Sequence, residues 1–259
     1  MAPPRTVRAT RYVTPLREGG SLPAIVEADD EGLYVLKFRG AGQGPRALVA
    51  ELIAGELARA LGLPVPEIVF AELDPELART EPDPEIHALI LDSAGLNLAL
   101  DYLPGSVAYD PVAQAPPPDL ASRIVWFDAY ASNVDRTPRN TNILMWHRRL
   151  WLIDHGATLY FHHTPNWEAA PGRARDPFAM ITSHVLLEHA TRLPDVDEEM
   201  AARLTPERVE EIVGWVPDVW LSGADPGVDV AAVRRAYVQY LLERARPPRA
   251  FVAEAIGVR

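Results

Sequence analysis

The chain has 259 residues, 48% of them hydrophobic, and its formal net charge of −11 at pH 7 argues against nucleic acid or an anionic membrane surface as a partner. The absence of cysteine excludes disulfides, thiolate zinc sites and cysteine nucleophiles, and it fits a reducing cytoplasm. No apolar run reaches the roughly 18 residues of a membrane span and residues 1–21 lack the apolar core of a signal peptide, which together predict a cytoplasmic protein.

The first third of the chain begins with three segments of strand-like alternation. Residues 8–16, 22–28 and 33–38 are separated by short polar turns, which predicts a three-stranded meander. The first turn contains Gly19, Gly20 and Ser21, whose backbone N–H groups could cover a phosphate. Glycine doublets are equally typical of ordinary hairpin turns, so this turn alone does not decide between the two interpretations.

The third of these strands carries Lys37, the only lysine in the chain, while the other 24 basic residues are arginines. An ammonium is a compact point charge that suits phosphate oxygens better than a planar guanidinium does. One lysine has to fall somewhere, but lysines mostly occupy exposed positions. Its place in an apolar strand therefore favours a functional role.

A glycine-rich connection at residues 40–45 precedes a strong helical pattern at 45–61, which Gly62 ends. Glu51 and Glu56 lie on this helix five positions apart and point in different directions, so only one can face Lys37. Further strand-like runs follow, with an acidic loop at 74–84 before the second of them. These runs cover residues 64–73, 85–91 and 96–103.

A proline-rich connector near residues 109–118 marks a change of composition, and we expect one lobe at 1–104 and a second at 105–259. The second lobe begins with a helical run, a polar turn and two short strand-like runs, and then reads as a long loop followed by helices. The corresponding ranges are 123–132 for the first helix, 142–146 and 150–153 for the strands, 161–178 for the loop, and 178–191, 205–213 and 228–244 for the later helices.

The polar turn between these elements concentrates groups suited to phosphate chemistry. Asp135 and Asn140 lie five positions apart, and Asp154 follows a hairpin that would return it beside them. Phosphoryl transfer needs an acceptor for a hydroxyl proton, hard oxygen ligands for Mg²⁺ and a cation on the nucleotide phosphates. Together with Lys37 these residues supply all three, although each aspartate alone could equally cap a turn or end a strand.

The order of strand lysine, helix glutamate, D-x-x-x-x-N and D-x-G resembles the protein-kinase-like superfamily. The runs Asp135-Arg136-x-x-x-Asn140 and Ile153-Asp154-His155-Gly156, with the segments 44–52 and 62–66, are similar to the HipA-like kinase family, a relative of the type II phosphatidylinositol 4-kinases. The resemblance implies an α+β, bilobal protein-kinase-like fold. It would have an antiparallel sheet plus one helix in the N-lobe and a mostly helical C-lobe, with a catalytic loop at 133–142 and a metal-binding strand end at 150–156.

The same resemblance implies a role for each candidate residue. Lys37 would bind the α- and β-phosphates of ATP and Glu51 would orient it, while Gly19, Gly20 and Ser21 would contact the nucleotide. Asp135 would be the catalytic aspartate, and Asn140 and Asp154 would hold Mg²⁺. We interpret Asn142 as a turn asparagine that satisfies backbone groups.

Three departures from the common kinase pattern stand out. His155 replaces the phenylalanine of D-F-G, no H-R-D precedes the catalytic turn, and the turn at 19–21 is not a full G-x-G-x-x-G. The adjacent His162 and His163 lack an evident third ligand, and we interpret them as loop residues instead of a metal site.

The leading hypothesis is a kinase that transfers the γ-phosphoryl group of ATP to a hydroxyl of a protein or small-molecule acceptor. A nucleotide-binding pseudokinase that regulates a partner is the alternative, and a phosphoinositide lipid kinase is disfavoured by the acidic charge. A serine hydrolase has little support, because no G-x-S-x-G elbow is present and Ser183 and His184 are neighbours on a helix-like run.

Overall fold

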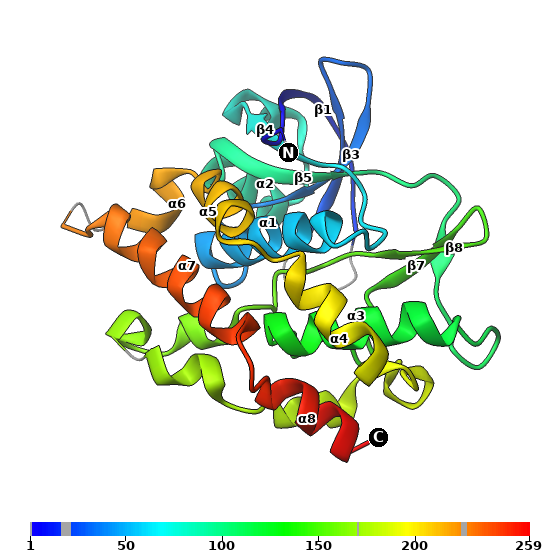
Figure 1. Ribbon diagram of the computed structural model, residues 1–259. Coiled ribbons are helices and arrows are strands. Elements are labelled where there is room, and N and C mark those ends of the chain that lie inside the picture. Colours follow the sequence, from blue (N-terminus) through cyan, green and yellow to red (C-terminus); the bar gives the residue numbers. More distant parts are fainter. Residues whose placement is uncertain (1, 17–21, 170, 224–226) are drawn as a thin grey trace.

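The computed structural model describes residues 2–16, 22–169, 171–223 and 227–259 (Figure 1). Five strands close into a barrel in the order β1-β2-β3-β5-β4. The predicted meander is present as the first three of them. The strands are β1 (Thr6–Pro15), β2 (Ala24–Ala28), β3 (Leu33–Lys37), β4 (Ile68–Leu73) and β5 (Gly95–Asp101).

The barrel corrects the expectation of a purely antiparallel sheet. All neighbours are antiparallel except β1 and β4, which run parallel. The register of β1 against β2 shifts twice, between Ala9 and Arg11 and between Tyr12 and Thr14. Such irregularities increase the twist of a long strand, so its beginning can pair with β4 while its end pairs with β2. Closure removes the exposed sheet edges.

Residues 85–91 form a helix, so the prediction of a strand there was wrong. Helix α2 (Pro84–Asp92) begins after Asp83, whose side chain accepts a hydrogen bond from the Glu85 N–H. Ile86 and Ile90 lie four positions apart and are buried against the barrel core. This spacing is helical, and the cap and the following proline are ordinary start signals. Among the described residues up to 104 there are therefore two α-helices, and the single one we predicted is α1.

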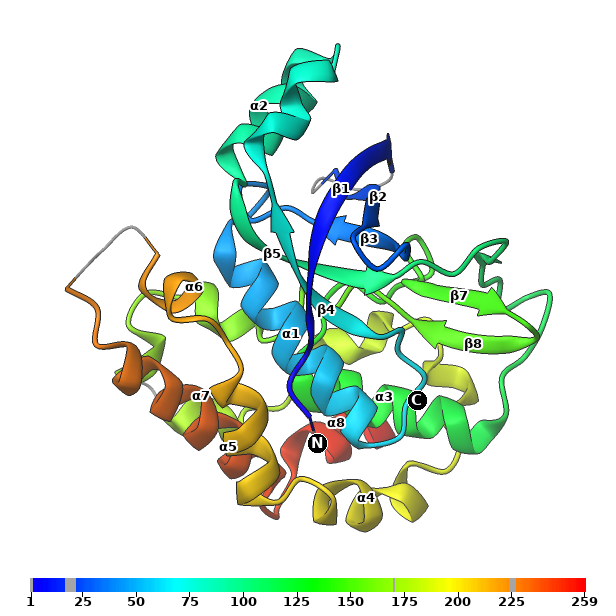
Figure 2. The same ribbon diagram turned by 90° about the horizontal axis from the view of Figure 1, so that it is seen from above.

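Helix α1 (Pro45–Ala60) lies where we predicted a helix, and it is buried on almost every side from Leu48 to Ala58. It contacts β4 and β5 of the barrel and also α5 (Pro206–Gly214) and α6 (Asp218–Ser222). Figure 2 shows α1 crossing the middle of the molecule, between the barrel and the later helices. Its side chains belong to the core that these helices share, so α1 is fixed on both sides.

The remaining chain is mostly helical around a short three-stranded sheet. The sheet comprises β6 (Val107–Ala108), β7 (Ile143–Trp146) and β8 (Arg149–Leu152), and the further helices are α3 (Pro118–Ala131), α4 (Leu193–Ala202), α7 (Val230–Ala245) and α8 (Ala250–Gly257). Helices were predicted near α3, α5 and α7, but α4, α6 and α8 were not anticipated.

No α-helix forms over residues 178–191, contrary to our prediction. The segment contains two 3₁₀ turns, Ala179–Ser183 and Leu187–His189. The Leu186 N–H donates to the ring nitrogen Nδ1 of His184 instead of a helical carbonyl. A side chain that takes a backbone donor in this way competes with the helix. None of the helices in the described part of the chain is both long and apolar enough to cross a membrane.

The close contact of α1 with β4 depends on Gly55, and this yields the first prediction. A Cβ at Gly55 would lie 2.4 Å from the Ile68 Cδ1. We expect Gly55→Val to lower the free energy of unfolding by about 1–3 kcal/mol, because the extra atoms overpack this contact. Urea denaturation measures the change. Gly214→Val is the matched control, since no atom lies within 4 Å of its added Cβ; equal losses in the two variants would contradict the packing account.

Candidate active site

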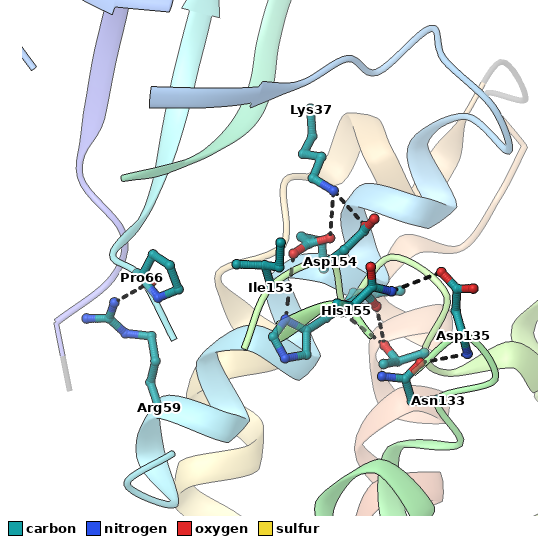
Figure 3. Close-up of polar contacts among 12 residues, drawn as sticks. Lys37, Arg59, Pro66, Asn133, Asp135, Ile153, Asp154 and His155 are labelled. Atoms are coloured by element: carbon teal, nitrogen blue, oxygen red, sulfur yellow. Dashed lines mark hydrogen bonds and ion pairs between the residues drawn. The ribbon is translucent and has the colours of Figure 1, made fainter. Parts of the chain in front are cut away.

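Lys37 is the last residue of β3, and its ammonium meets carboxylates from two other elements (Figure 3). Its Nζ lies 2.6 Å from Asp154 Oδ1 and 3.7 Å from Glu51 Oε2 on α1. The Glu51 side chain is only 2% exposed, whereas that of Asp154 is 38% exposed. The structure thus brings three predicted site residues together, with Asp154 on the side open to solvent.

The charges of this group stabilise one another. Burial by itself would lower the pKa of Lys37, but the carboxylates of Glu51 and Asp154 outweigh it and raise the pKa above its ordinary value. Burial likewise favours a raised pKa for Glu51, yet the Lys37 ammonium and the nearby His155 lower it. Both Lys37 and Glu51 are therefore ionised at neutral pH.

Glu56, the other glutamate on α1, faces away from this group. Its Oε2 lies 3.5 Å from the Arg59 Nε on the same helix. The expectation that only one of the two glutamates can reach Lys37 therefore agrees with the structure, and Glu51 is the one that does so.

Asp154 follows β8 by two residues in a conformation that ends the strand. Its φ of 56° lies in the left-handed region, which few residues other than glycine adopt and which aspartate tolerates better than most. The Ile153 N–H still donates to the Asn142 carbonyl, so the chain leaves the sheet only at Asp154. This turn places the Asp154 carboxylate beside Lys37.

Asp135 lies in the loop between α3 and β7, held by three asparagine side chains. Its Oδ2 accepts hydrogen bonds from Asn140 Nδ2 at 2.8 Å and from Asn142 Nδ2 at 3.0 Å, and its N–H donates to Asn133 Oδ1 at 3.1 Å. Asn142 was predicted to satisfy backbone groups, but its side chain contacts Asp135 instead. The Asn140 and Asn142 amides both donate through nitrogen, which leaves their oxygens available to a cation.

The loop is anchored by a buried ion pair that the sequence reasoning missed. Arg136 Nε lies 2.6 Å from Asp128 Oδ2, and neither side chain is exposed to solvent. Asp128 also contacts His184 Nε2 at 2.8 Å and accepts a hydrogen bond from Asn133 at 2.8 Å. Burial favours a raised pKa for Asp128, but Arg136 and His184 lower it. The sequence did contain a signal for Asp128, because it is a lone carboxylate within the apolar run of α3.

Arg136 also links the two groups of candidate residues. It donates to the backbone carbonyl of Asn142 and, at 3.5 Å, to that of Ile153, the residue before Asp154. Among the described residues no hydrogen bond joins Asp135 directly to Asp154. The guanidinium therefore sets the position of the loop at 133–142 relative to the strand end through backbone groups.

The available oxygen donors fit magnesium better than a soft metal. Asp154 offers a partly exposed carboxylate and Asn140 an exposed amide oxygen. Within the described ranges there is no cluster of three His, Cys, Asp or Glu side chains that could hold a metal ion. Mg²⁺ commonly binds one or two carboxylates together with waters and substrate phosphates, which this donor set permits. Gly19, Gly20 and Ser21 lie outside the described residues.

The histidines that we considered for other chemistry have structural partners. Both ring nitrogens of His184 are occupied, by Asp128 and by the Leu186 N–H, so His184 is not available as a base for Ser183. His162 contacts the Tyr237 hydroxyl at 2.9 Å and the His163 ring nitrogen at 3.0 Å. Burial, followed by His163 and Arg46, lowers the pKa of His162 to about 3, so this ring is neutral.

Comparisons with known proteins agree with this fold. CtkA, a proinflammatory kinase of Helicobacter pylori, matches with a TM-score of 0.55 and 11% identity over 98% of this chain and 99% of its own. The structure of Golgi casein kinase matches with a TM-score of 0.46, and that of the same kinase with Mn/ADP bound matches with a TM-score of 0.47. Each match has 12% identity and covers 96% of this chain and 75% of the other. No relative was found among curated proteins. The likeness to CtkA establishes a protein-kinase-like fold.

The family follows from the sequence itself. The model of the HipA-like kinase family matches residues 10–251, which is nearly the whole chain. The chain therefore belongs to the HipA-like kinases, as its motifs predicted.

The Arg136–Asp128 pair gives the second prediction. Arg136→Met leaves the Asp128 carboxylate buried without its main countercharge, and we expect a loss of about 3–5 kcal/mol in the free energy of unfolding. The matched control is Arg192→Met, which breaks a surface pair with Asp195 whose side chains are more than half exposed and should change stability by less than about 1 kcal/mol. Similar losses in both variants, measured by urea denaturation, would show that the buried pair does not organise the loop.

Proposed function

We propose that the protein is an ATP- and Mg²⁺-dependent kinase that transfers the γ-phosphoryl group to a hydroxyl of a protein or small-molecule acceptor. The single observation that carries the proposal is the position of Lys37, the only lysine in the chain, between a buried glutamate of α1 and the solvent-facing Asp154. Membership of the HipA-like kinase family supports it.

Each residue has a role that its contacts support. Lys37 binds the nucleotide phosphates and Glu51 keeps it oriented, because Glu51 is buried and held on a helix that is packed on both sides. Asp154 and Asn140 would hold Mg²⁺, which supplies positive charge to the phosphates when it is bound. Asp135 accepts the proton of the acceptor hydroxyl, and the amide groups of Asn140 and Asn142 fix its orientation.

The arrangement of these residues further suggests that two lobes, residues 1–104 and 105–259, enclose the nucleotide. Lys37 and Glu51 come from the first segment, while Asp135, Asn140 and Asp154 come from the second. The prediction that Gly19, Gly20 and Ser21 contact the nucleotide falls outside the described residues and stays an expectation from the sequence. ATP is the nucleotide, and a cytoplasmic location, with no nucleic acid or membrane partner, remains our expectation from the sequence.

A nucleotide-binding pseudokinase is the second candidate. Such a protein would bind Mg·ATP without transferring phosphate. It is disfavoured because every role that phosphoryl transfer needs has a suitable side chain at the site. A phosphoinositide kinase is disfavoured by the net charge of −11, which repels an anionic membrane surface.

Substitution of the two site aspartates tests the proposal. We expect Asp135→Asn and Asp154→Ala each to lower ADP release from Mg·ATP by about a thousandfold or more, since the first removes the proton acceptor and the second a metal ligand. A coupled assay with a panel of hydroxyl acceptors measures this release. Asp195→Asn, which changes an exposed carboxylate paired only with Arg192, serves as the control and should retain wild-type turnover.

Two outcomes would count against the proposal. Full turnover in both aspartate variants would contradict the assigned roles. Tight Mg·ATP binding by calorimetry, without ADP release from the wild-type chain in the presence of any acceptor, would instead favour the pseudokinase.

A further inference from the structure

His155, the residue after Asp154, is buried without a partner for either ring nitrogen. Its side chain has no exposed surface, and among the described residues neither Nδ1 nor Nε2 has a hydrogen-bond partner. The Glu51 Oε1 is buried and unpartnered in the same way. These two groups face each other, with Nδ1 3.7 Å from Oε1. Figure 3 shows the ring beneath the Lys37 and Asp154 pair.

Unpartnered buried polar atoms are rare in proteins and carry a desolvation penalty. Here the donor and the acceptor that could satisfy each other are already adjacent. A separation of 3.7 Å is too long for a hydrogen bond, but a small shift to the roughly 2.8 Å of a charge-assisted bond would satisfy both atoms. The other oxygen of Glu51 faces Lys37, so the carboxylate lies between the ammonium and the imidazole.

The backbone around His155 holds the ring against α1. Its carbonyl accepts hydrogen bonds from the Thr158 N–H at 3.0 Å and from the Thr158 hydroxyl at 2.7 Å. The same hydroxyl lies 3.4 Å from the carbonyl of Ala50, the neighbour of Glu51. Phe127 meets the ring edge to face, with centroids 6.2 Å apart. The position of the imidazole relative to Glu51 is therefore set by both the backbone and the packing.

Among the described residues, the charged group within reach of Nδ1 is Glu51, and Lys37 and Asp154 lie beyond it on the solvent side. Gly55, one turn after Glu51 on α1, approaches the same nitrogen, since an added Cβ would lie 3.9 Å from Nδ1, and Phe127 packs against the ring. A phenylalanine, as in the D-F-G sequence, could fill such a space but has no donor for Glu51.

We propose that His155 is a positioning residue that donates a hydrogen bond from Nδ1 to Glu51 and thereby keeps Glu51 directed at Lys37. The need for it arises when Lys37 turns from Asp154 toward nucleotide phosphates, because Glu51 then shares the Lys37 ammonium with the ligand. The functional role that we assign to this contact rests on the proposed kinase function. The contact itself can be measured without any turnover.

The single lysine makes the measurement possible. Isotope-labelled lysine gives one side-chain NMR signal, that of Lys37, whose position reports the carboxylates beside it. Four variants are compared with the wild-type chain: His155→Phe, His155→Asn, Glu51→Gln and the double variant of His155→Phe with Glu51→Gln. The asparagine amide nitrogen occupies the place of Nδ1 and retains a donor, whereas phenylalanine retains only the ring.

We expect His155→Phe to move the Lys37 signal in the same direction as Glu51→Gln, and His155→Asn to leave it at the wild-type position. The double variant should show no additional shift beyond Glu51→Gln. A wild-type signal in His155→Phe, or shifts that add fully in the double variant, would overturn the proposal and leave His155 as a packing residue.

An NMR signal of the His155 ring itself keeps the proposal testable if a His155 variant fails to fold. With labelled histidine, the Nδ1–H of His155 should appear as a protected proton signal that is lost in Glu51→Leu, which removes the acceptor oxygen. Persistence of this signal in Glu51→Leu would overturn the proposal.

Kinetics separate this inference from the proposed function. In an active enzyme we expect His155→Phe to raise the KM for ATP by about tenfold or more, with KM restored in His155→Asn. A lower kcat with unchanged KM would contradict nucleotide-linked positioning. Absence of turnover in the wild-type chain would contradict the kinase function alone, since the Lys37 signal decides the role of His155.

Discussion

The buried contact of Lys37 with Glu51 and Asp154 is the interaction on which the rest of the site depends. It joins the end of β3, the middle of α1 and the turn after β8, three segments far apart in the chain. A lysine or glutamate buried alone would be strongly unfavourable, so each requires the others to remain charged. The fold satisfies this by holding α1 between the barrel and the helices, where Glu51 cannot move away without disturbing the core that they share.

A second buried charge pair, Arg136 with Asp128, anchors the loop of Asp135. Through backbone carbonyls it connects this loop to the residue before Asp154. In the function we propose, the first pair would fix the cation for the phosphates and the second would fix the carboxylate for the acceptor. Because both are shielded from water, their geometry is defined before any ligand binds, which is what catalysis by positioning requires.

The sequence predicted those elements and site residues that are determined by nearby positions in the chain. Alternation revealed the first three strands, a proline and helical spacing revealed α1, the isolated lysine directed attention to Glu51, and the polar turn with its following hairpin revealed Asp135, Asn140 and Asp154. Barrel closure was not predictable, because the parallel pairing of β1 with β4 depends on partners distant in sequence. Helix α2 was misassigned because a short apolar run suits either a strand or a buried helix.

The role of Asp128 was missed for a similar reason. In the sequence it is one acid in an apolar helix, and only the fold brings Arg136 and His184 to it. His184 in turn removes residues 178–191 from a helix by taking the Leu186 N–H, an effect that no periodicity reveals. His155 was noted only as a departure from D-F-G, since its contact with Glu51 requires the two regions to meet in space.

A structure determined with Mg²⁺ and a nonhydrolysable ATP analogue tests the central claim most directly. We predict a metal ion bound by both Asp154 and Asn140, with the Lys37 ammonium on the nucleotide phosphates and Asp135 facing the γ-phosphate. A nucleotide bound away from Lys37, or a metal that contacts neither Asp154 nor Asn140, would contradict the assignment of this site.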